Sequence, residues 1–355
     1  MDIKLNMQPN ITIAGRRIAA DVPPYVIAEM SANHNGNIET ALMIIETARK
    51  SGADAVKLQT YRPETITLNC DSQDFRIQGG LWDGRTLYDL YQEAHMPWEW
   101  HAALFAHAQK LGITIFSSPF DNTAVDLLED LNAPAYKIAS FEAVDLPLIK
   151  YVASTGKPMI ISTGMADAQE IQEAIDAARE GGSQELAVLH CVSGYPAPAA
   201  DYNLRTIPDM IQRFGLVTGL SDHTLDNATA IASVAMGASI IEKHFTLDRK
   251  GGGPDDSFSL EPSDLLELCR DTKLAWQALG QVDYAHKSSE QANLKFRRSL
   301  YFVKALKVGD VITADAVRSV RPGFGLPPKY LTEIIGQRVT RDVNENSPVT
   351  PESLR

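Results

Sequence analysis

The stretch Tyr25-Val-Ile-Ala28 is a short apolar run, and a second run, Ala55-Val-Lys-Leu58, follows the amphipathic residues 38–51. Apolar side chains recur in residues 38–51 with a period near 3.6, which predicts a helix, and Gly52 is typical of a position just past a helix end. Runs this short and this apolar predict strands that are buried on both faces. Residues 25–58 therefore read as one strand–helix–strand unit.

The same unit repeats along the chain. Further apolar runs predict strands at residues 114–117, 135–138, 158–162, 186–190, 216–219 and 239–244. Helical patterns lie between and after them at residues 98–111, 123–131, 168–180, 227–236 and 262–279. Buried strands that alternate with helices predict a parallel sheet, and eight such strands favour a closed (β/α)8 TIM barrel over an open sheet.

Three further regions accompany the predicted barrel. Residues 10–18 alternate around a turn at Ala14-Gly15 and predict a small hairpin. The connection 60–97 is too long for a plain loop, and we expect its residues 81–88 to cover a site. The polar residues 281–295 predict a linker between a domain of residues 1–280 and a small β-rich domain of residues 296–355.

Composition excludes several classes of protein. The chain has 355 residues and a formal net charge of −12, which argues against a protein that binds nucleic acid through its phosphates. No apolar run approaches the roughly 20 residues of a membrane helix, and residues 1–10 have no apolar signal core. The three cysteines form no CxxC pair and predict reduced thiols. We therefore expect a cytoplasmic protein with no membrane partner.

Polar side chains gather at the predicted carboxyl ends of the strands, where the active sites of such barrels lie. They are Glu29, Lys57, Gln59, Ser117, Ser118, Lys137, Ser140, Ser162, Ser193, Ser221, His223, Glu242 and His244. A lysine here can bind an anion, form a Schiff base with a carbonyl substrate, or make a salt bridge at the barrel rim. The neighbouring serine hydroxyls favour the anion, because they are donors of the kind that surround phosphate or carboxylate.

His223 and His244 end two strands that are neighbours in the predicted barrel, so their imidazoles can bind one metal ion. Glu242 precedes His244 by two residues and faces the same way on a regular strand. Asp255 follows the glycines of Gly251-Gly-Gly-Pro-Asp255 and either reaches the site or lies in a solvated turn. His34 is either catalytic or bonded to its loop, and Cys191 is expected to be a small buried thiol.

The motifs that contain these residues resemble those of the sialic acid synthase family. They are Ala28-Glu-Met-Ser-Ala-Asn-His-Asn-Gly36, Val56-Lys-Leu-Gln-Thr60, Tyr136-Lys-Ile-Ala-Ser140, Ile161-Ser-Thr-Gly-Met165, Gly219-Leu-Ser-Asp-His-Thr224, Ile241-Glu-Lys-His-Phe-Thr246, Gly253-Pro-Asp255 and Arg321-Pro-Gly323. The C-terminal residues resemble the antifreeze-like (SAF) domain that follows the barrel in this family. The resemblance implies a transferase that condenses phosphoenolpyruvate with an N-acylated amino sugar to a nine-carbon 2-keto acid.

The same resemblance implies roles for individual residues. Those that would hold phosphoenolpyruvate are Lys57, Gln59, Ser118, Lys137, Ser140, Ser162 and Ser221. His223 and His244 would bind a divalent metal, usually Mn²⁺, with Mg²⁺ or Co²⁺ as alternatives. Candidates for proton transfer are Glu29, Glu242 and Asp255, and Ser193 and Tyr195 would face the sugar. Arg321 matches an arginine that enters the barrel of a partner subunit, which implies a domain-swapped homodimer.

The residues after the sixth predicted strand indicate a branch of the family. N-acetylneuraminate synthases typically have Cys-Thr-Asn-x-Tyr-Pro here, whereas this chain has Cys191-Val-Ser-Gly-Tyr-Pro196. Residues 82–88, 97–101 and 255–262 resemble the pseudaminic acid synthase branch, whose acceptor is 2,4-diacetamido-2,4,6-trideoxy-altropyranose. N-acetylneuraminate and legionaminate synthases are the alternatives within the family. A class I aldolase with Lys57 or Lys137 as the nucleophile and a non-catalytic carbohydrate- or ice-binding protein are the alternatives outside it.

Overall fold

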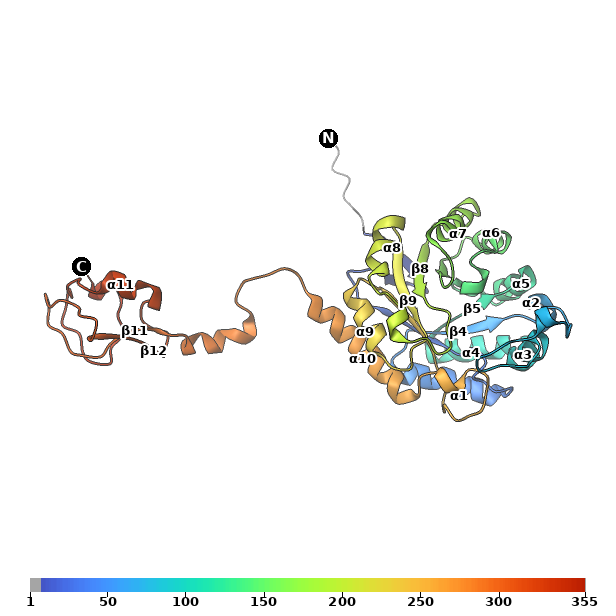
Figure 1. Cartoon of the computed structure of the whole chain (residues 1–355), viewed down its shortest axis with the longest axis horizontal. Helices are drawn as coiled ribbons and strands as arrows, with labels where there is room; N and C mark the ends of the chain where they lie inside the picture. The colour runs from blue at the N-terminus through green and yellow to red at the C-terminus, as the bar shows by residue number, and fades with distance from the viewer. Residues whose placement is uncertain (1–7, 355) are drawn as a thin grey trace, which may run out of the picture. The chain divides into compact units, whose positions relative to one another are not determined.

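A computed structural model describes residues 8–354, so part of the N-terminal segment that shows no signal core lies outside the described residues. The chain forms two compact units, Met1–Gly280 and Gln281–Arg355 (Figure 1). Within the part of the chain that the structure describes, no helix has the length and apolarity to cross a membrane.

The first unit is a closed barrel of eight parallel strands, which confirms the predicted (β/α)8 fold. In barrel order after β10 (Ile240–His244), the strands are β3 (Tyr25–Glu29), β4 (Ala55–Thr60), β5 (Thr114–Pro119), β6 (Tyr136–Ile138), β7 (Met159–Ser162), β8 (Leu186–Cys191) and β9 (Val217–Asp222). Several strands extend beyond their predicted ends, because polar residues such as Gln59 and Asp222 continue the ladder after the apolar run.

Helices surround the strands (Figure 1). They are α1 (Ile38–Ser51), α4 (His101–Leu111), α5 (Asn122–Asp130), α6 (Leu146–Ala153), α7 (Ala168–Glu180), α8 (Thr206–Phe214), α9 (Ala228–Ala235) and α10 (Pro262–Leu279). The first helix shows why the ends were predictable. The Asn37 side chain accepts the backbone N–H of Glu39, and Gly52 takes the left-handed φ of 93° that glycine adopts without strain.

The predicted hairpin forms from β1 (Ile11–Ile13) and β2 (Arg16–Ile18), which pair antiparallel. Its isoleucines belong to the same buried cluster as Tyr25, Ile27 and Phe116 of the barrel strands. Because the same cluster contains the first residues of β4, β9 and β10 (Ala55, Val217 and Ile240), the hairpin covers the end of the barrel opposite the carboxyl ends of the strands. The polar residues predicted for the site therefore lie above a buried apolar cluster that closes the other end of the barrel.

The long connection 60–97 is structured rather than a plain loop. It contains α2 (Pro63–Ile66), a 3-10 turn at Gln73–Phe75 and α3 (Leu87–Ala94). Between the last two, a β-bridge joins Arg76 to Thr86 and closes a short hairpin. Sequence periodicity missed these elements because each spans at most a few turns.

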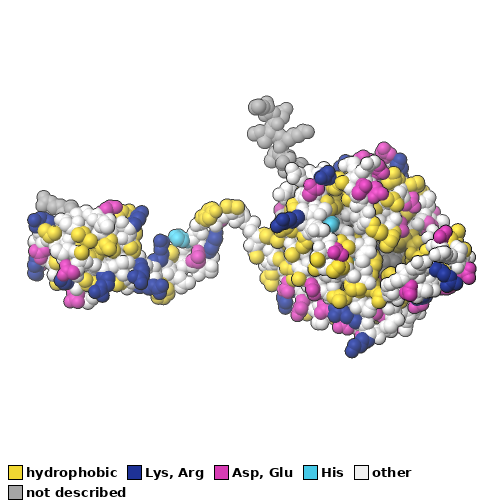
Figure 2. Space-filling view, in the orientation of Figure 1, with side chains coloured by type: hydrophobic (Ala, Val, Ile, Leu, Met, Phe, Trp, Pro, Cys, Tyr) yellow, Lys and Arg dark blue, Asp and Glu magenta, His cyan; other side chains and the backbone are white. Residues whose placement is uncertain are grey.

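The second unit has its own buried core, which includes Leu300, Phe302, Ile312 and Val349. Its regular elements include a 3-10 segment (Ser288–Phe296), the antiparallel pair β11 (Ser299–Phe302) and β12 (Val317–Val320), and α11 (Leu331–Ile334). The 3-10 segment occupies half of the residues predicted as a linker. On the first unit, acidic and basic side chains are interspersed over the visible face (Figure 2).

Candidate active site

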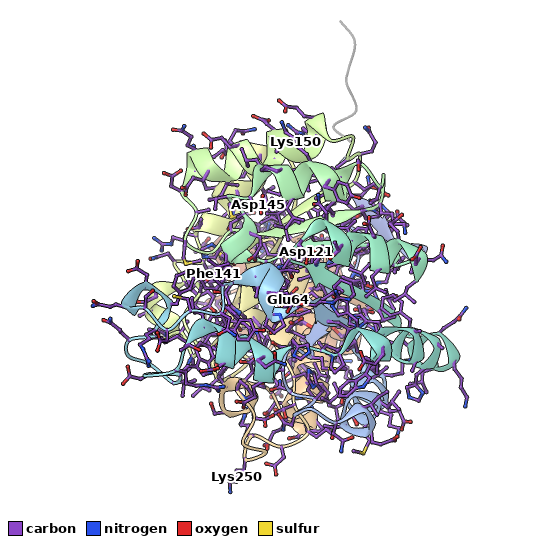
Figure 3. The ribbon with its side chains drawn as sticks, turned by 90° about the vertical axis from the view of Figure 1, so that its right-hand side faces the viewer. Glu64, Asp121, Phe141, Asp145, Lys150 and Lys250 are labelled. Carbon is purple, nitrogen blue, oxygen red and sulfur yellow. The ribbon has the colours of Figure 1, made fainter. Side chains whose placement is uncertain are left out.

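The carboxyl ends of the strands and their connections form one face of the barrel. Figure 3 looks onto this face, where Glu64 of α2 lies near the centre and Asp121 and Phe141 lie beside it. Lys250, from the connection after β10, lies at the lower edge of this view. Polar side chains from several strands meet beneath these connections, in the upper part of the barrel.

Lys57 is the centre of a buried cluster. Its Nζ lies 2.7 Å from Glu29 Oε2, 3.5 Å from Glu242 Oε1 and 3.2 Å from Ser118 Oγ. Gln59 donates from Nε2 to Glu29 Oε1 at 2.9 Å. The register explains the contact, because β3 and β4 place Glu29 directly beside Lys57.

Lys137 forms a second, adjoining cluster. Its Nζ donates to Ser162 Oγ at 2.6 Å and lies 3.8 Å from Glu242 Oε1. Ser221 Oγ is 3.5 Å from the same Glu242 oxygen. Ser140 accepts the Gly164 N–H at 3.2 Å. The structure thus brings both predicted lysines and their serines into one buried region around Glu242.

Gly164 permits the close approach of two predicted side chains. A Cβ at this position would lie 2.2 Å from Ser193 Oγ and 2.8 Å from Ser140 Oγ. Ser193 and Ser140 therefore both lie close to the Gly164 backbone. Cys191 is buried, as expected, with its Sγ 3.4 Å from Ser140 Oγ.

The buried charges shift one another's pKa values. Burial raises the pKa of Glu29 to about 7, although Lys57 opposes this. Burial acts on Glu242 in the same direction, but Lys137 and Lys57 lower its pKa below the usual value. Glu29 and Glu242 therefore have different pKa values although they belong to the same cluster, and Glu29 can carry a proton near neutral pH. Burial also lowers the pKa of Lys137.

His223 and His244 lie side by side, with ring centroids 5.4 Å apart. The Nδ1–H of His223 donates to the Val192 carbonyl at 2.8 Å, which leaves the lone pair of its Nε2 free when the ring is neutral. Burial and the neighbouring His223 hold the pKa of His244 well below its usual value, so His244 is neutral. Its buried Nδ1 has no hydrogen-bond partner among the described residues.

These features fit a divalent ion in their donor chemistry. Metal binding needs neutral imidazoles, and Oε2 of Glu242 is buried without a hydrogen-bond partner among the described residues. The side chains do not converge as a finished site, because residues 8–354 contain no group of three or more His, Cys, Asp or Glu side chains arranged as ligands. Although burial opposes it, the neighbouring Cys191 raises the pKa of His223, so this ring must lose its proton before it can bind an ion. The structure therefore places two imidazoles side by side, without a complete coordination shell among residues 8–354.

Tyr195 and Asp255 border the histidines. The Tyr195 ring lies 4.4 Å from the His223 ring. Asp255 is buried rather than solvated, accepts Ser31 Oγ–H at 2.5 Å and lies 3.8 Å from His244 Nδ1. The connection after β10 therefore reaches the mouth of the barrel. Arg321, the remaining predicted residue, is exposed in the second unit.

Two expected residues lie elsewhere. Ser117 points out of the barrel, where its Oγ is 2.6 Å from Thr60 Oγ1, because adjacent strand residues face opposite sides. His34 is buried away from the lysines, accepts the Gly36 N–H at 3.1 Å and packs edge-on against Trp100. His34 therefore makes the hydrogen bond to its own loop that was one of its two expected roles.

Sequence reasoning missed Ser31 and Lys243. Ser31 takes a left-handed φ of 45° and links Asp255 to Gln59, with Gln59 Nε2 2.9 Å from its Oγ. Lys243 is buried between the ends of β9 and β10, with its Nζ 2.8 Å from Asp222 Oδ2 and 2.8 Å from the carbonyls of both Thr224 and Asp226. It holds the turn that carries His223. A charged residue on the outward face of a buried strand was the available signal.

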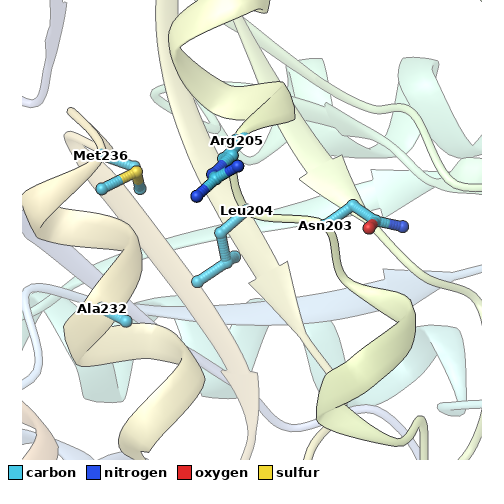
Figure 4. A pocket seen from close by; sticks show the side chains of 5 residues that line it. All are labelled: Asn203, Leu204, Arg205, Ala232 and Met236. Atoms are coloured by element: carbon cyan, nitrogen blue, oxygen red, sulfur yellow. The ribbon is translucent and has the colours of Figure 1, made fainter.

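A separate cavity of about 390 Å³ lies in the helical layer, between the start of α8 and α9. Its lining is mainly apolar, with Leu204, Ala232 and Met236 facing it and Arg205 at its edge (Figure 4). It contains none of the predicted site residues. The buried cluster in the barrel mouth, rather than this cavity, is the candidate active site.

The fold and the site together define a (β/α)8-barrel protein with a buried lysine–carboxylate cluster at the carboxyl ends of its strands. Comparison with known families matches residues 44–284 to the NeuB family and residues 297–355 to the SAF domain. The chain belongs to the NeuB family, and the predicted resemblance to sialic acid synthases is confirmed.

Individual relatives cover almost the whole chain. Pseudaminic acid synthase from Helicobacter pylori is 42% identical over 94% of this chain and 98% of its own length. N,N'-diacetyllegionaminic acid synthase from Campylobacter jejuni is 36% identical over 90% of this chain and 97% of its own. The crystal structure of N-acetylneuraminic acid synthetase from Leptospira borgpetersenii covers 82% of this chain and 97% of its own, with a TM-score of 0.72 and 30% identity.

Proposed function

We propose that the protein is a pseudaminic acid synthase, which condenses phosphoenolpyruvate with 2,4-diacetamido-2,4,6-trideoxy-altropyranose. The observation that carries the reaction class is the pair of buried lysines, Lys57 and Lys137, with serine hydroxyls beside both. Such a set neutralises a small substrate with several negative charges. The 42% identity to named pseudaminic acid synthases supports the choice of sugar.

The reaction balances without an external oxidant or reductant. C3 of phosphoenolpyruvate forms a bond to the aldehyde carbon of the open-chain sugar, and the aldehyde oxygen gains a proton. Water adds at C2 and loses a proton, and the bond from C2 to the bridging oxygen breaks. Phosphate leaves with that oxygen and takes up the proton that the C2 hydroxyl loses, and C2 becomes the ketone of a nine-carbon acid.

The position and charge of each residue indicate its role in this reaction. Lys57, Lys137 and their serines hold the phosphate and carboxylate of phosphoenolpyruvate. Glu29 is the strongest candidate to move a proton, because its raised pKa suits exchange near neutral pH. Glu242 stays ionised between the lysines and orients them, and Asp255 faces the sugar hydroxyls near His244.

His223 and His244 would hold a divalent metal, with Mn²⁺ the first choice and Mg²⁺ or Co²⁺ the alternatives. When bound, such an ion supplies Lewis acidity at the aldehyde oxygen. The bond from His223 Nδ1 to Val192 orients one ring for this purpose, and the unpartnered Nδ1 of His244 offers the second donor.

One experiment separates this proposal from a class I aldolase. The protein is incubated with phosphoenolpyruvate that carries ¹⁸O in the bridging position, with and without the sugar. A synthase releases phosphate that retains the label, only when the sugar is present. An aldolase releases no phosphate and is instead trapped by borohydride with the keto acid as a covalent adduct on a lysine.

We also propose that the active form is a domain-swapped homodimer in which Arg321 enters the partner's barrel mouth. The support is the motif around Arg321 and the match of residues 297–355 to the SAF domain. An Arg321→Ala chain mixed with a His223→Ala chain tests this. Exchange of subunits should restore activity, because one mouth of each mixed pair regains both residues. A mixture that stays inactive despite proven exchange would overturn the swap.

A further inference from the structure

The hairpin within the long connection 60–97 has a defined conformation. The N–H of Ile77 donates to Arg85 O and that of Gly84 donates to Ile77 O, both at 2.9 Å. Arg85 also donates to Glu93 Oε2 at 2.6 Å, which ties the hairpin to α3. The tip of the hairpin, which carries Trp82, is therefore held in place from both sides.

Trp82 reaches across to the active site. Its Nε1–H donates to the Pro254 carbonyl at 3.2 Å, next to the site residue Asp255. Its ring centroid lies 6.1 Å from that of Tyr195, and Trp82 is only partly exposed. Two connections of the barrel thus meet at one indole.

Trp82 is the outermost ring of an aromatic wall. Tyr195 lies 4.4 Å from the His223 ring and 5.3 Å from Phe258, whose ring is 5.1 Å from His244. The wall therefore begins at the histidine pair and ends at Trp82. Because the indole N–H is already bonded to Pro254, the ring offers an apolar face and no free donor.

We propose that Trp82 is a specificity-determining residue that contacts the far, C6 end of the acceptor sugar and favours a methyl group there over a hydroxymethyl group. This inference rests on the proposed function. The proposed reaction places the aldehyde, C1, at the histidine pair, so a sugar that extends along the wall brings its other end to the outermost ring.

Desolvation sets the direction and size of the preference. A C6 hydroxyl against the indole face loses water and gains no partner, whereas a methyl group is favoured there. An apolar wall rejects an added hydroxyl only modestly, by about 10- to 100-fold. Trp82 should therefore contribute a preference of this size and no more.

The test compares kcat/KM for two acceptors that differ only at C6, the 2,4-diacetamido 6-deoxy sugar and its 6-hydroxy counterpart. We expect the wild-type protein to prefer the deoxy sugar, and Trp82→Ala to reduce the ratio of the two kcat/KM values at least tenfold. The KM for phosphoenolpyruvate should change little. Trp82→Phe should keep most of the ratio, because an apolar ring remains.

Trp98 offers a matched control. Its Nε1–H also donates to a backbone carbonyl, that of Tyr61 at 3.2 Å, but its ring stacks on Arg62 rather than on Tyr195. Trp98→Ala should leave the ratio unchanged. The inference is overturned if Trp82→Ala lowers both sugars equally or changes neither. Failure of the proposed function is seen separately, as a wild-type protein that turns over neither sugar.

Discussion

Lys57 and Glu29 form an ion pair in the barrel interior, with 2.7 Å between Nζ and Oε2 and almost no exposure of either side chain. The same lysine also lies within 3.5 Å of Glu242. Before any substrate binds, Lys57 thus compensates Glu29 and shares the compensation of Glu242 with Lys137. An anionic substrate must share this lysine, so binding and the protonation of Glu29 are linked.

Replacing Lys57 should therefore affect stability as well as activity. Lys57→Met leaves Glu29 and Glu242 buried without their closest cation, and we expect a loss of about 3–5 kcal/mol in the free energy of unfolding. Denaturation in urea measures this loss. Phosphate release should fall to background, because phosphoenolpyruvate also loses a counter-charge.

A double variant separates the two effects. Lys57→Met with Glu29→Gln removes both charges and should recover much of the stability but none of the activity. Lys137→Met is a matched control, because Lys137 lies 3.8 Å from its nearest carboxylate and should cost less stability. Equal stability losses for the two single lysine variants would contradict the central role of Lys57.

Lys243 should affect activity indirectly, because it supports the turn that contains His223 and is not itself among the predicted site residues. Lys243→Met removes three close hydrogen bonds from the turn 222–226, so His223 loses its support. We expect weaker Mn²⁺ binding and lower kcat, with little change in the KM for phosphoenolpyruvate. Isothermal titration with Mn²⁺ and steady-state kinetics check this. Unchanged Mn²⁺ affinity in a folded variant would show that the turn does not depend on Lys243.

Strand alternation explains which site residues could be predicted. Lys57 and Gln59 are two residues apart on β4, so the sequence alone predicts that their side chains face the same side of the strand. In the structure both side chains contact Glu29. The pairings of Glu29 with Lys57 and of Asp222 with Lys243 depend on the register of neighbouring strands. The stagger of a closed barrel sets that register, and an apolar pattern does not encode it.

Connections were less predictable than strands for the same reason. The length of residues 60–97 indicated a covering segment, but the contact of Trp82 with Tyr195 joins two connections that follow different strands. Asp255 had two possible environments in sequence terms, and only its bond to Ser31 decides between them. Such contacts depend on three-dimensional placement rather than on local pattern.

We expect that removing either histidine, or the metal itself, abolishes activity. His223→Ala and His244→Ala should each abolish turnover and lower Mn²⁺ occupancy, because each removes one of two imidazoles with an available nitrogen. Treatment of the wild-type protein with a chelator should have the same effect, and Mn²⁺ should reverse it. Full activity in a protein shown by elemental analysis to be free of metal would refute a metal-assisted reaction.

His34 should make the fold sensitive to mild acid. Burial lowers its pKa to about 4, whereas an unfolded histidine titrates near pH 6.5. The unfolded chain therefore binds a proton first, and stability present above pH 6.5 is lost as the pH falls toward 4. The loss attributable to this ring is on the order of 3 kcal/mol at pH 4.

His34→Asn isolates this contribution, because the amide oxygen can still accept the Gly36 N–H. The free energy of unfolding, measured in urea from pH 7.5 to pH 5, should fall less steeply in this variant than in the wild type. Parallel pH profiles would show that His34 is not the group responsible.

A competition between two sugars tests the proposed function most directly. Limiting phosphoenolpyruvate is supplied with equal concentrations of 2,4-diacetamido-2,4,6-trideoxy-altropyranose and N-acetylmannosamine, and the nine-carbon products are counted by mass spectrometry. The account predicts that the diacetamido product dominates, with one phosphate released for each molecule formed. An excess of N-acetylneuraminate, or equal amounts of the two products, would contradict it.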